Sequence, residues 1–366
     1  MVKIAVAGAG IAGLFAAISL QRDGHQVYVY DKETLADVHD SGVYLSSDAL
    51  LSVLRSGATV LAHALLEHGI SLSRHTINIF NGREFDTHDI DQGSTGIAPL
   101  LIRRSQLLSI LRAQLEPKTY FIDSPLTRFS QALDQVDAIF ASQPKWSGDL
   151  LLAADGLNSY ACRQLKVNRT LTYLGHRAWT GLAFDDSLVT NGLFQNYIVE
   201  NELCLTTFDL GADAHGRQQT HWCLFERSPF PTAEQSAHSQ RNTIPKIAFQ
   251  SLPPIIESLF QSTPHDLISN KWVFDLEPLS KLVHHRVALV GDAAHAMAPT
   301  QGRGVAAGFE DALALSAAIA KYRVDVPQAL LAYEQLRLNE VSFAQLQSRK
   351  EYGYPVASVP VLKRHC

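Results

Sequence analysis

The chain has 366 residues and a formal net charge of −5 at pH 7; 46% of its residues are hydrophobic and 18% are charged. This balance is typical of a globular protein with a large core, and it excludes the basic excess expected of a nucleic-acid-binding protein. The four cysteines, Cys162, Cys204, Cys223 and Cys366, lack the spacing of a metal site or a disulfide framework, so we expect reduced thiols, no metal and a cytoplasmic location.

The first 31 residues predict a strand, a helix and a second strand, at residues 3–7, 11–22 and 25–31. The loop after the first strand, Gly8-Ala9-Gly10-Ile11-Ala12-Gly13, fits the pattern G-x-G-x-x-G. Its glycines allow a tight turn, the approach of a pyrophosphate to the helix N-terminus, and close packing of helix on strand. Asp31 ends the second strand, where its carboxylate would accept hydrogen bonds from ribose hydroxyls. The pattern therefore indicates a dinucleotide site.

The same glycines interrupt the apolar N-terminal run, which argues against a signal peptide, and no stretch is long and apolar enough for a membrane span. Further along, turn residues and periodicity predict helices at 46–56, 104–115 and 243–260, a hairpin at 75–91 that turns at Asn81-Gly82, a buried strand at 148–156 and an antiparallel sheet over 171–226.

A second glycine-rich segment follows a buried strand predicted at 286–292, and helices are predicted at 304–322 and 327–352. Asp292 stands where it could bind the polyol chain of a cofactor, or it could simply cap a short helix over residues 293–298. Gly302 and Gly304 precede a helix whose free N–H groups would face negative charge. The α/β portion is thus built from separated segments with the sheet portion inserted between them.

Three motifs in this order resemble those of the single-component FAD-dependent aromatic hydroxylases, the class A flavoprotein monooxygenases such as para-hydroxybenzoate, salicylate and urate hydroxylases. They are Gly8–Gly13 with Asp31, AADGLNS at 153–159 and GDAAHAMAPTQGRG at 291–304. The resemblance implies an α/β fold with a Rossmann-like FAD-binding domain (residues 1–74, 96–170 and 272–352), an inserted antiparallel β-sheet substrate domain (75–95 and 171–271) and a C-terminal tail (353–366).

It also implies a function. The chain is expected to bind FAD, to use NADH or NADPH and O2, and to hydroxylate a small aromatic or heteroaromatic substrate through a flavin C4a-hydroperoxide, as a monomer or homodimer. Two alternatives stay open: an FAD-dependent reductase or oxidase on the same fold, and a non-catalytic flavin-binding redox module. No dense arginine cluster lies in the sheet portion, which favours a small or mainly apolar aromatic substrate over a polyanion.

The resemblance and the motifs together give the candidate residues. Cofactor contacts are expected from Gly8, Gly10, Ala12, Gly13, Asp31, Arg104 (in preference to Arg103), Asp155, Gly156, Gly291, Asp292, Pro299, Gly302, Gly304 and Val305. Pro299 would also border the reactive face of the ring, and His221 or His176 could serve as a base because histidine titrates near neutrality. His295 is expected to be structural. The candidate pocket linings are Tyr44, Arg177, Trp179, Tyr197, Phe208 and Trp222.

The chain departs from the family pattern at three places. Cys162, followed by Arg163, stands where an arginine is usual, which weakens the case for nucleotide contacts there. Arg303 replaces the glutamine between the two glycines, and we expect it to point to solvent. Ala306 stands where asparagine is common.

Overall fold

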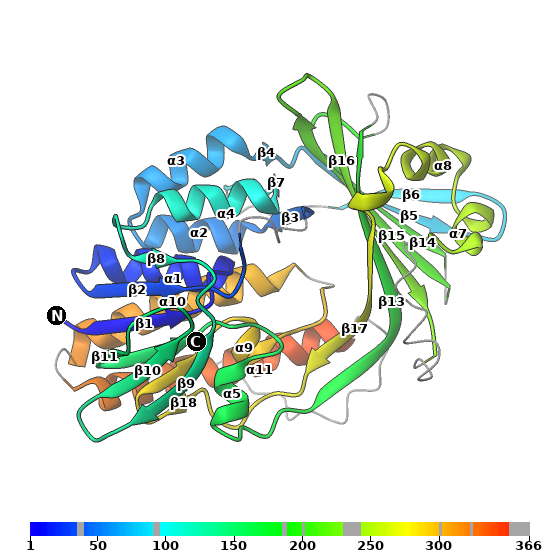
Figure 1. The fold of residues 1–366 in the computed structure, drawn as a ribbon. Helices are drawn as coiled ribbons and strands as arrows, with labels where there is room; N and C mark the ends of the chain where they lie inside the picture. The colour runs from blue at the N-terminus through cyan, green and yellow to red at the C-terminus, as the bar shows by residue number, and fades with distance from the viewer. Residues whose placement is uncertain are drawn as a thin grey trace.

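The structure, a computed structural model, describes residues 1–34, 40–90, 96–184, 189–199, 202–229, 243–299, 302–322 and 325–350. It has an α/β part and a second part built on a large sheet, shown side by side in Figure 1. The α/β part contains a six-stranded sheet in the order β18-β19-β12-β1-β2-β8. Its strands are β1 (Lys3–Ala7), β2 (Gln26–Tyr30), β8 (Tyr120–Phe121), β12 (Leu150–Ala153), β18 (Val283–His284) and β19 (Val287–Leu289).

Strand β1 pairs in parallel with both β2 and β12, and β12 pairs in parallel with β19. The predicted strand–helix–strand unit and the predicted buried strand near residue 287 are therefore confirmed. Because the carboxyl ends of parallel strands meet at one edge, the loops after β1, β12 and β19 all open at the same edge of the sheet. These are the loops that carry the three motifs.

Helices cover one side of this sheet and a small antiparallel meander covers the other (Figure 1). The helices are α1 (Ile11–Arg22), α2 (Ser47–Arg55), α3 (Thr59–His68), α4 (Arg104–Ala113), α10 (Arg303–Tyr322) and α11 (Val326–Lys350). The meander consists of β9 (Leu126–Gln131), β10 (Val136–Phe140) and β11 (Trp146–Gly148), and the short α5 (Tyr160–Gln164) follows β12. Within the described ranges, no helix is both long and apolar enough to cross a membrane.

Helices α1 and α10 approach each other closely at Ala12. A Cβ built on Gly308 of α10, or on Gly291 in the loop after β19, would lie 2.7 Å from the Cβ of Ala12, well inside van der Waals contact. One turn along, the rings of Phe15 and Phe309 stack with their centroids 4.0 Å apart. Because residues 291 and 308 are glycines, the two helices and the second glycine-rich loop can pack closely around Ala12.

The second part is a seven-stranded sheet in the order β17-β13-β16-β15-β14-β5-β6. Its strands are β5 (Arg74–Phe80), β6 (Phe85–Asp89), β13 (Leu171–Phe184), β14 (Leu193–Val199), β15 (Leu203–Ala212), β16 (Gln218–Arg227) and β17 (Ser269–Leu276). The predicted hairpin and antiparallel sheet are confirmed, and β14 pairs in parallel with β5. Strand β17 is continuous across the domain boundary expected between residues 271 and 272.

The single helix predicted over residues 243–260 is wrong. Two helices, α7 (Lys246–Ser251) and α8 (Pro254–Gln261), stand there. The break falls at Pro253-Pro254, because proline disfavours helical backbone in the residue before it and lacks the N–H that a continuing helix needs. Both helices cover the outer face of the large sheet, and the one-turn helix η1 (His265–Leu267) leads back into β17.

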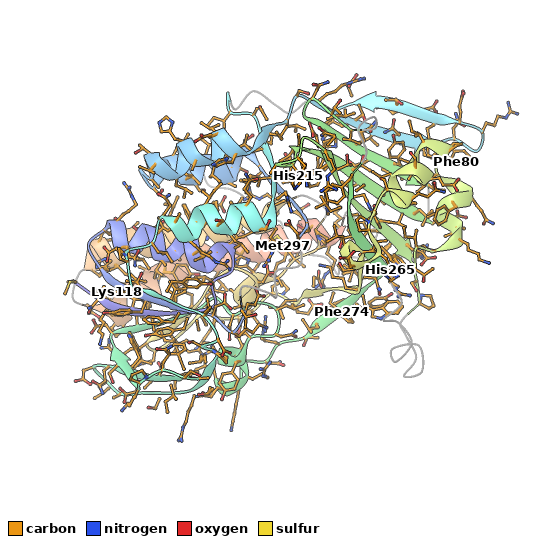
Figure 2. The ribbon with its side chains drawn as sticks, turned by 45° about the horizontal axis from the view of Figure 1, so that its top comes forward. Phe80, Lys118, His215, His265, Phe274 and Met297 are labelled. Atoms are coloured by element: carbon orange, nitrogen blue, oxygen red, sulfur yellow. The ribbon has the colours of Figure 1, made fainter. Side chains whose placement is uncertain are left out.

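A three-stranded sheet that sequence analysis did not predict joins the two parts. It consists of β3 (Gly42–Leu45), β7 (Leu100–Arg103) and β4 (Ile70–Ser71), in the order β3-β7-β4. Leu101 of β7 packs in one apolar cluster with Leu182 and Phe208 of the large sheet. Figure 2 shows Met297 between the two parts, and the next residue, Ala298, packs against Ala178 and Val273 of the large sheet.

The contact at Ala12 predicts the effect of adding one methyl group. Alanine normally stabilises a helix relative to glycine by about 1 kcal/mol, but at position 308 the new Cβ would overlap Ala12. We expect Gly308→Ala to lower the free energy of unfolding by about 1–3 kcal/mol, the usual cost of overpacking, in denaturant titrations of the apoprotein. The matched control is Gly304→Ala in the same helix, where a Cβ meets nothing within 4 Å. Equal stability of the two variants would contradict the packing constraint.

Candidate functional site

The first glycine-rich loop has the shape of a cradle for a phosphate group. Gly8 has φ +106°, and a Cβ there would collide with the carbonyl of Ala154. Gly10 precedes α1 without capping its N–H groups through a side chain, and the space where its Cβ would stand is empty. Free N–H groups at a helix start beside open space fit an anionic pyrophosphate.

Asp31 holds this loop in place. Its side chain is buried, one carboxylate oxygen accepts a hydrogen bond from the N–H of Ala9 at 2.8 Å, and the other accepts one from the N–H of Glu33 at 3.0 Å. Each carboxylate oxygen has two lone pairs, so both oxygens keep the capacity to accept a ribose hydroxyl.

The second glycine-rich loop leads from β19 into the one-turn helix α9 (Asp292–His295). Gly291 has φ +57°, a conformation that favours glycine. Asp292 is the first residue of the helix and makes no capping hydrogen bond, so the alternative in which it merely caps this helix is wrong. Its carboxylate is exposed and has no partner among the described residues, which leaves it able to accept from the hydroxyls of a polyol chain.

The Asp-Gly motif lies beside the first loop. One oxygen of Asp155 accepts hydrogen bonds from the N–H groups of Tyr160 and Ala161 at 2.7 and 3.0 Å, which caps α5. The other oxygen is buried and has no partner in the described part of the chain. A buried acceptor without a donor is costly, so this atom fits a hydroxyl or water that accompanies a bound dinucleotide. Gly156 has φ +78°, a conformation that favours glycine.

At the position where the family pattern has arginine, Cys162 is fully buried and its thiol lies 3.5 Å from the carbonyl of Ala293. Burial raises the pKa of this thiol. Arg169 donates to the carbonyls of Leu157 and Asp292 at 2.6 and 3.1 Å. These contacts fasten the Asp-Gly loop to the loop after β19, so Cys162 serves packing at this point.

Behind α9, a buried carboxylate connects the loop after β19 to two helices. Asp311 accepts hydrogen bonds from the N–H of Gly291 at 3.0 Å and from Nε of Arg337 at 2.9 Å, and His295 Nε2 lies 2.6 Å from it. Burial alone would lower the pKa of His295, but the Asp311 carboxylate outweighs burial and raises the pKa overall. His295 and Asp311 thus form a buried ion pair that fixes the turn at Gly291 and lies outside the cleft lining.

Arg303 does not point freely to solvent, contrary to expectation. Its guanidinium forms ion pairs with Asp48 of α2 and, at 3.1 Å, with Glu310 of α10, and its side chain is only 28% exposed. The two carboxylates, one on α2 and one on α10, hold the guanidinium between these helices. Ala306, where the family pattern has asparagine, is fully buried in the α/β core.

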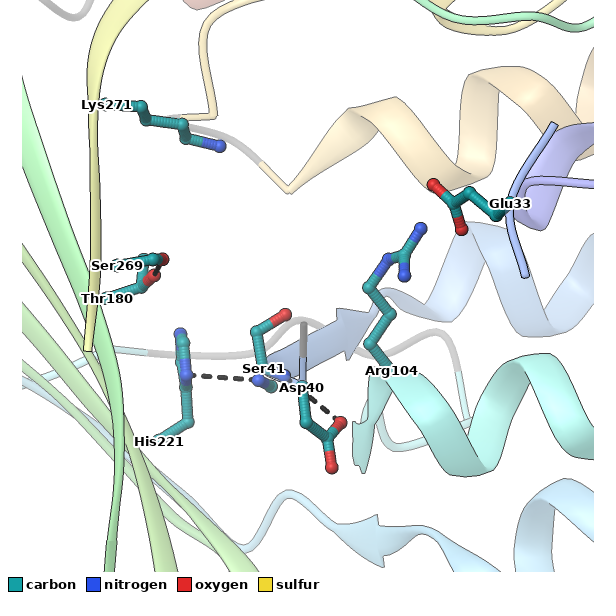
Figure 3. Close-up of a pocket in the computed structure, with 9 residues that line it drawn as sticks. Glu33, Asp40, Ser41, Arg104, Thr180, His221, Ser269 and Lys271 are labelled. Carbon is teal, nitrogen blue, oxygen red and sulfur yellow. Dashed lines mark hydrogen bonds between the residues drawn. The ribbon is translucent and has the colours of Figure 1, made fainter. Parts of the chain in front are cut away.

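Between the two parts lies a cleft of about 400 Å³ (Figure 3). The α/β part contributes Glu33, Asp40, Ser41, Gly42 and Arg104, and the large sheet contributes Thr180, His221, Ser269 and Lys271. The guanidinium of Arg103 forms an ion pair with Asp40 and does not line the cleft. Arg104 lines the cleft and has no ion-pair partner among the described residues. Of the two arginines, Arg104 is therefore the one presented to the cleft.

His221 is not available as a base. Its Nδ1 accepts a hydrogen bond from the N–H of Gly42 at 3.0 Å, and burial lowers its pKa to about 4, against a weaker opposing effect of its hydrogen bond to the backbone of Gly181. The neutral ring therefore fastens β3 to the large sheet. His176 is not among the residues that line the cleft: its Nδ1 lies 2.6 Å from the carbonyl of Leu174, and burial lowers its pKa too.

Two of the predicted pocket residues lie at the junction of the parts. The ring of Tyr44 covers Gly302, whose Cβ would stand 2.8 Å from its Cδ1, and it meets Phe194 edge-on at 5.6 Å. Phe208 stacks on the same Phe194 at 5.3 Å. They form an apolar wall next to the cleft rather than its polar lining.

The other four, Arg177, Trp179, Tyr197 and Trp222, lie on the opposite face of the sheet, so their assignment to the pocket was wrong. Trp222 is fully buried against Phe260 of α8, and the guanidinium of Arg177 lies over the ring of Trp179. Alternate residues of a strand point to opposite faces, and the register here turns this set toward α7 and α8.

The remaining predicted residues, at positions 299, 302, 304 and 305, are not among those that line the cleft. Pro299 is exposed directly after Ala298, which packs on the large sheet, and Gly302 has φ +61° before α10 begins. A Cβ on Gly304 would meet open space, and Val305 is partly buried in the first turn of α10. Sequence analysis missed the cleft residues Glu33, Asp40, Ser41, Gly42, Thr180, Ser269 and Lys271. The alternation of Ser269 and Lys271 along one strand was the only signal for any of them.

Comparison with known proteins is consistent with this geometry. The model of a family described as FAD binding domain matches residues 1–344. FAD-dependent urate hydroxylase of Klebsiella pneumoniae is 28% identical over 360 residues, 95% of this chain and 89% of that protein. Aurachin C monooxygenase/isomerase of Stigmatella aurantiaca is 25% identical over 341 residues, 93% of this chain and 86% of that protein. The crystal structure of Klebsiella pneumoniae HpxO complexed with FAD and uric acid has a TM-score of 0.79 at 26% identity, covering 96% and 88% of the two chains.

The buried ion pair makes stability depend on pH. Because the folded-state pKa of His295 is raised above its ordinary value of 6.5, its contribution is fully present below pH 6.5 and is lost as pH rises through the raised pKa. We expect the free energy of unfolding to fall over that window with a slope approaching about 1.4 kcal/mol per pH unit. His295→Gln should lack this component, whereas His265→Gln, at an exposed position in η1, should keep it. Parallel curves for wild type and His295→Gln would contradict the ion pair.

Proposed function

Since the chain belongs to the FAD binding domain family and its relatives are FAD-dependent monooxygenases, we propose that it uses NADH or NADPH and O2 to hydroxylate a small aromatic or heteroaromatic substrate. The observation that carries the proposal is the cleft lined from both parts, with Glu33 and Arg104 on the α/β side and a face of the large sheet on the other. Asp31, which holds the first glycine-rich loop, also accepts a hydrogen bond from the N–H of Glu33, so this loop lies close to the cleft. A cofactor held by the loops would have its reactive end beside a substrate resting on the sheet.

The residues divide the binding of FAD between them. The N–H groups at the start of α1 and the guanidinium of Arg104 would hold the pyrophosphate, Asp31 the ribose, and Asp292 the ribityl chain. The free N–H groups at the start of α10, from Gly304 and Val305, would face the negative charge that the ring carries when reduced. When bound, FAD supplies the electron transfer and the activation of oxygen.

The protein's own work is to position the substrate and to keep water away. Phe208 and Leu182 of the sheet and Tyr44 of β3 form the apolar wall beside the cleft. Excluding water there would strengthen the electrostatic contacts inside the site and limit side reactions. His221 fastens β3 to the sheet by accepting a hydrogen bond from the N–H of Gly42, which joins the wall to the α/β part.

The proposal also includes a cytoplasmic location and no metal ion. The free cysteines Cys162, Cys204 and Cys223 fit a reducing compartment such as the cytoplasm. The described residues contain no group of three or more histidine, cysteine or acidic side chains that could hold a metal ion, so none is invoked.

Asp292 gives a direct test of cofactor binding. Because its exposed carboxylate has no partner among the described residues, Asp292→Ala removes a ligand contact without breaking an internal one. We expect FAD to bind about 10-fold more weakly, as when one charge-assisted hydrogen bond is lost, with the thermal stability of the apoprotein unchanged. Isothermal titration of the apoprotein with FAD gives the dissociation constant of FAD for wild type and for Asp292→Ala. Asp266→Ala, at an exposed position in η1, is the control and should bind like wild type.

The reaction itself is tested with the FAD-loaded protein. NADH and NADPH are each added without oxygen, with and without members of an aromatic library, and the bleaching of flavin absorbance is followed. Air containing ¹⁸O₂ is then admitted and the products are weighed by mass spectrometry. We expect a ligand that accelerates bleaching and gains one labelled oxygen atom. If every ligand yields only hydrogen peroxide, the protein is an oxidase or reductase; if nothing stimulates bleaching, a redox module is favoured.

A further inference from the structure

We propose that Lys271 is the residue that determines substrate specificity in the cleft, and that it selects aromatic substrates carrying an anionic oxygen, a carboxylate or a phenolate. The inference rests on the proposed function and deepens it. Sequence analysis favoured a mainly apolar aromatic substrate because the sheet portion has no arginine cluster. The inference adds one anionic oxygen to that substrate, because a lysine lines the cleft.

The strand register places Lys271 on the cleft side of the sheet. In β17, Ser269 pairs with Thr180 and Lys271 pairs with Ala178, so these residues share the face that looks toward the α/β part. The next residue on that face, Val273, packs under Ala298 of the loop after α9. Figure 3 shows the side chain of Lys271 extending from β17 into the space that separates the sheet from Arg104.

The charges that line the cleft leave the ammonium of Lys271 without a partner. Asp40 is engaged by Arg103 and by the hydroxyl of Ser105 at 2.9 Å. Glu33 stands on the far side of the cleft with Arg104 (Figure 3). No ion pair or hydrogen bond joins the ammonium of Lys271 to any residue in the described ranges. On the sheet side, therefore, the cleft presents one positive charge that nothing there neutralises.

Two hydroxyl groups stand beside this charge. Thr180 Oγ1 and Ser269 Oγ are 2.7 Å apart, so one donates to the other and the second hydroxyl hydrogen is left for another acceptor. His221, the remaining polar group of the sheet side, already uses Nδ1 for Gly42. A flexible ammonium with a free hydroxyl donor suits a charged oxygen on the substrate. Lys271 is exposed, so a neutral ring would leave its ammonium to water, whereas an anionic oxygen would pair with it.

The test measures binding to the FAD-loaded protein, before any turnover. The probes are benzoate, 2-naphthoate and quinoline-4-carboxylate, each with its neutral amide, and 4-nitrophenolate with 4-nitroanisole at pH 8.5. Dissociation constants come from the perturbation of the flavin absorbance and from calorimetry. We expect at least one anion to bind about 10-fold more tightly than its neutral partner, the effect of one charge-assisted contact.

Three variants show whether Lys271 causes the preference. Lys271→Gln should bring the anion and its neutral partner to within about twofold of each other, and Lys271→Arg, which keeps the charge, should retain most of the preference. Lys246→Gln, which removes an exposed lysine on α7 across the sheet, should behave like wild type. FAD content and thermal stability of each variant are measured first, and Lys271→Met replaces the glutamine variant if that variant does not hold FAD.

Two results would overturn the inference: no anion binds more tightly than its neutral partner, or the preference survives in Lys271→Gln. The outcome is separate from that of the proposed function. A charge preference without any oxygenated product defeats the function and leaves the role of Lys271 standing as a binding role. Oxygenated products formed equally well from neutral and anionic ligands defeat the role of Lys271 and leave the function.

Discussion

The contact of Ala12 with Gly291 and Gly308 is the constraint on which the site depends. It brings the start of α1, the loop after β19 and the first turns of α10 into van der Waals contact, although they come from opposite ends of the chain. Any side chain at 291 or 308 would push these backbones apart. The second glycine-rich segment is therefore required both by its own turn, at φ +57°, and by the first segment, against which it packs.

The buried carboxylate of Asp311 also holds the loop after β19 and lies outside the cleft lining. Asp311 gathers Gly291, His295 and Arg337 around one carboxylate, and removing one member would leave a buried charge uncompensated. The arrangement fixes the backbone that carries Asp292 while leaving the Asp292 side chain exposed. A rigid support for a free ligand group is what a cofactor site needs, since a loosely held carboxylate would lose binding energy to ordering.

At the junction of the two parts, apolar side chains and polar side chains lie in separate places. Leu101, Leu182 and Phe208 close one side of the junction, while the cleft beside them keeps hydroxyls, Arg104 and Lys271. His221 belongs to the first group in spite of its polarity, because its ring is neutral and tied to the backbone of β3. In the proposed function, recognition of the substrate falls to the edge of the sheet formed by β13 and β17, and the wall supplies an apolar surface beside it.

The sequence by itself determined the strand–helix–strand unit, the hairpin at Asn81-Gly82 and the three loops that carry the motifs, because glycine spacing and strand alternation act locally. It could not decide which face of the large sheet meets the cleft, so Trp179 and Trp222 were assigned to the wrong side. A strand pattern with period two fits either face equally well, and only the packing of α7 and α8 chose between them. The partners of His221 and Arg303 were decided in the same way, by tertiary contacts between residues far apart in the chain, for which no local pattern exists. The position of Lys271 in the cleft was also decided by tertiary structure.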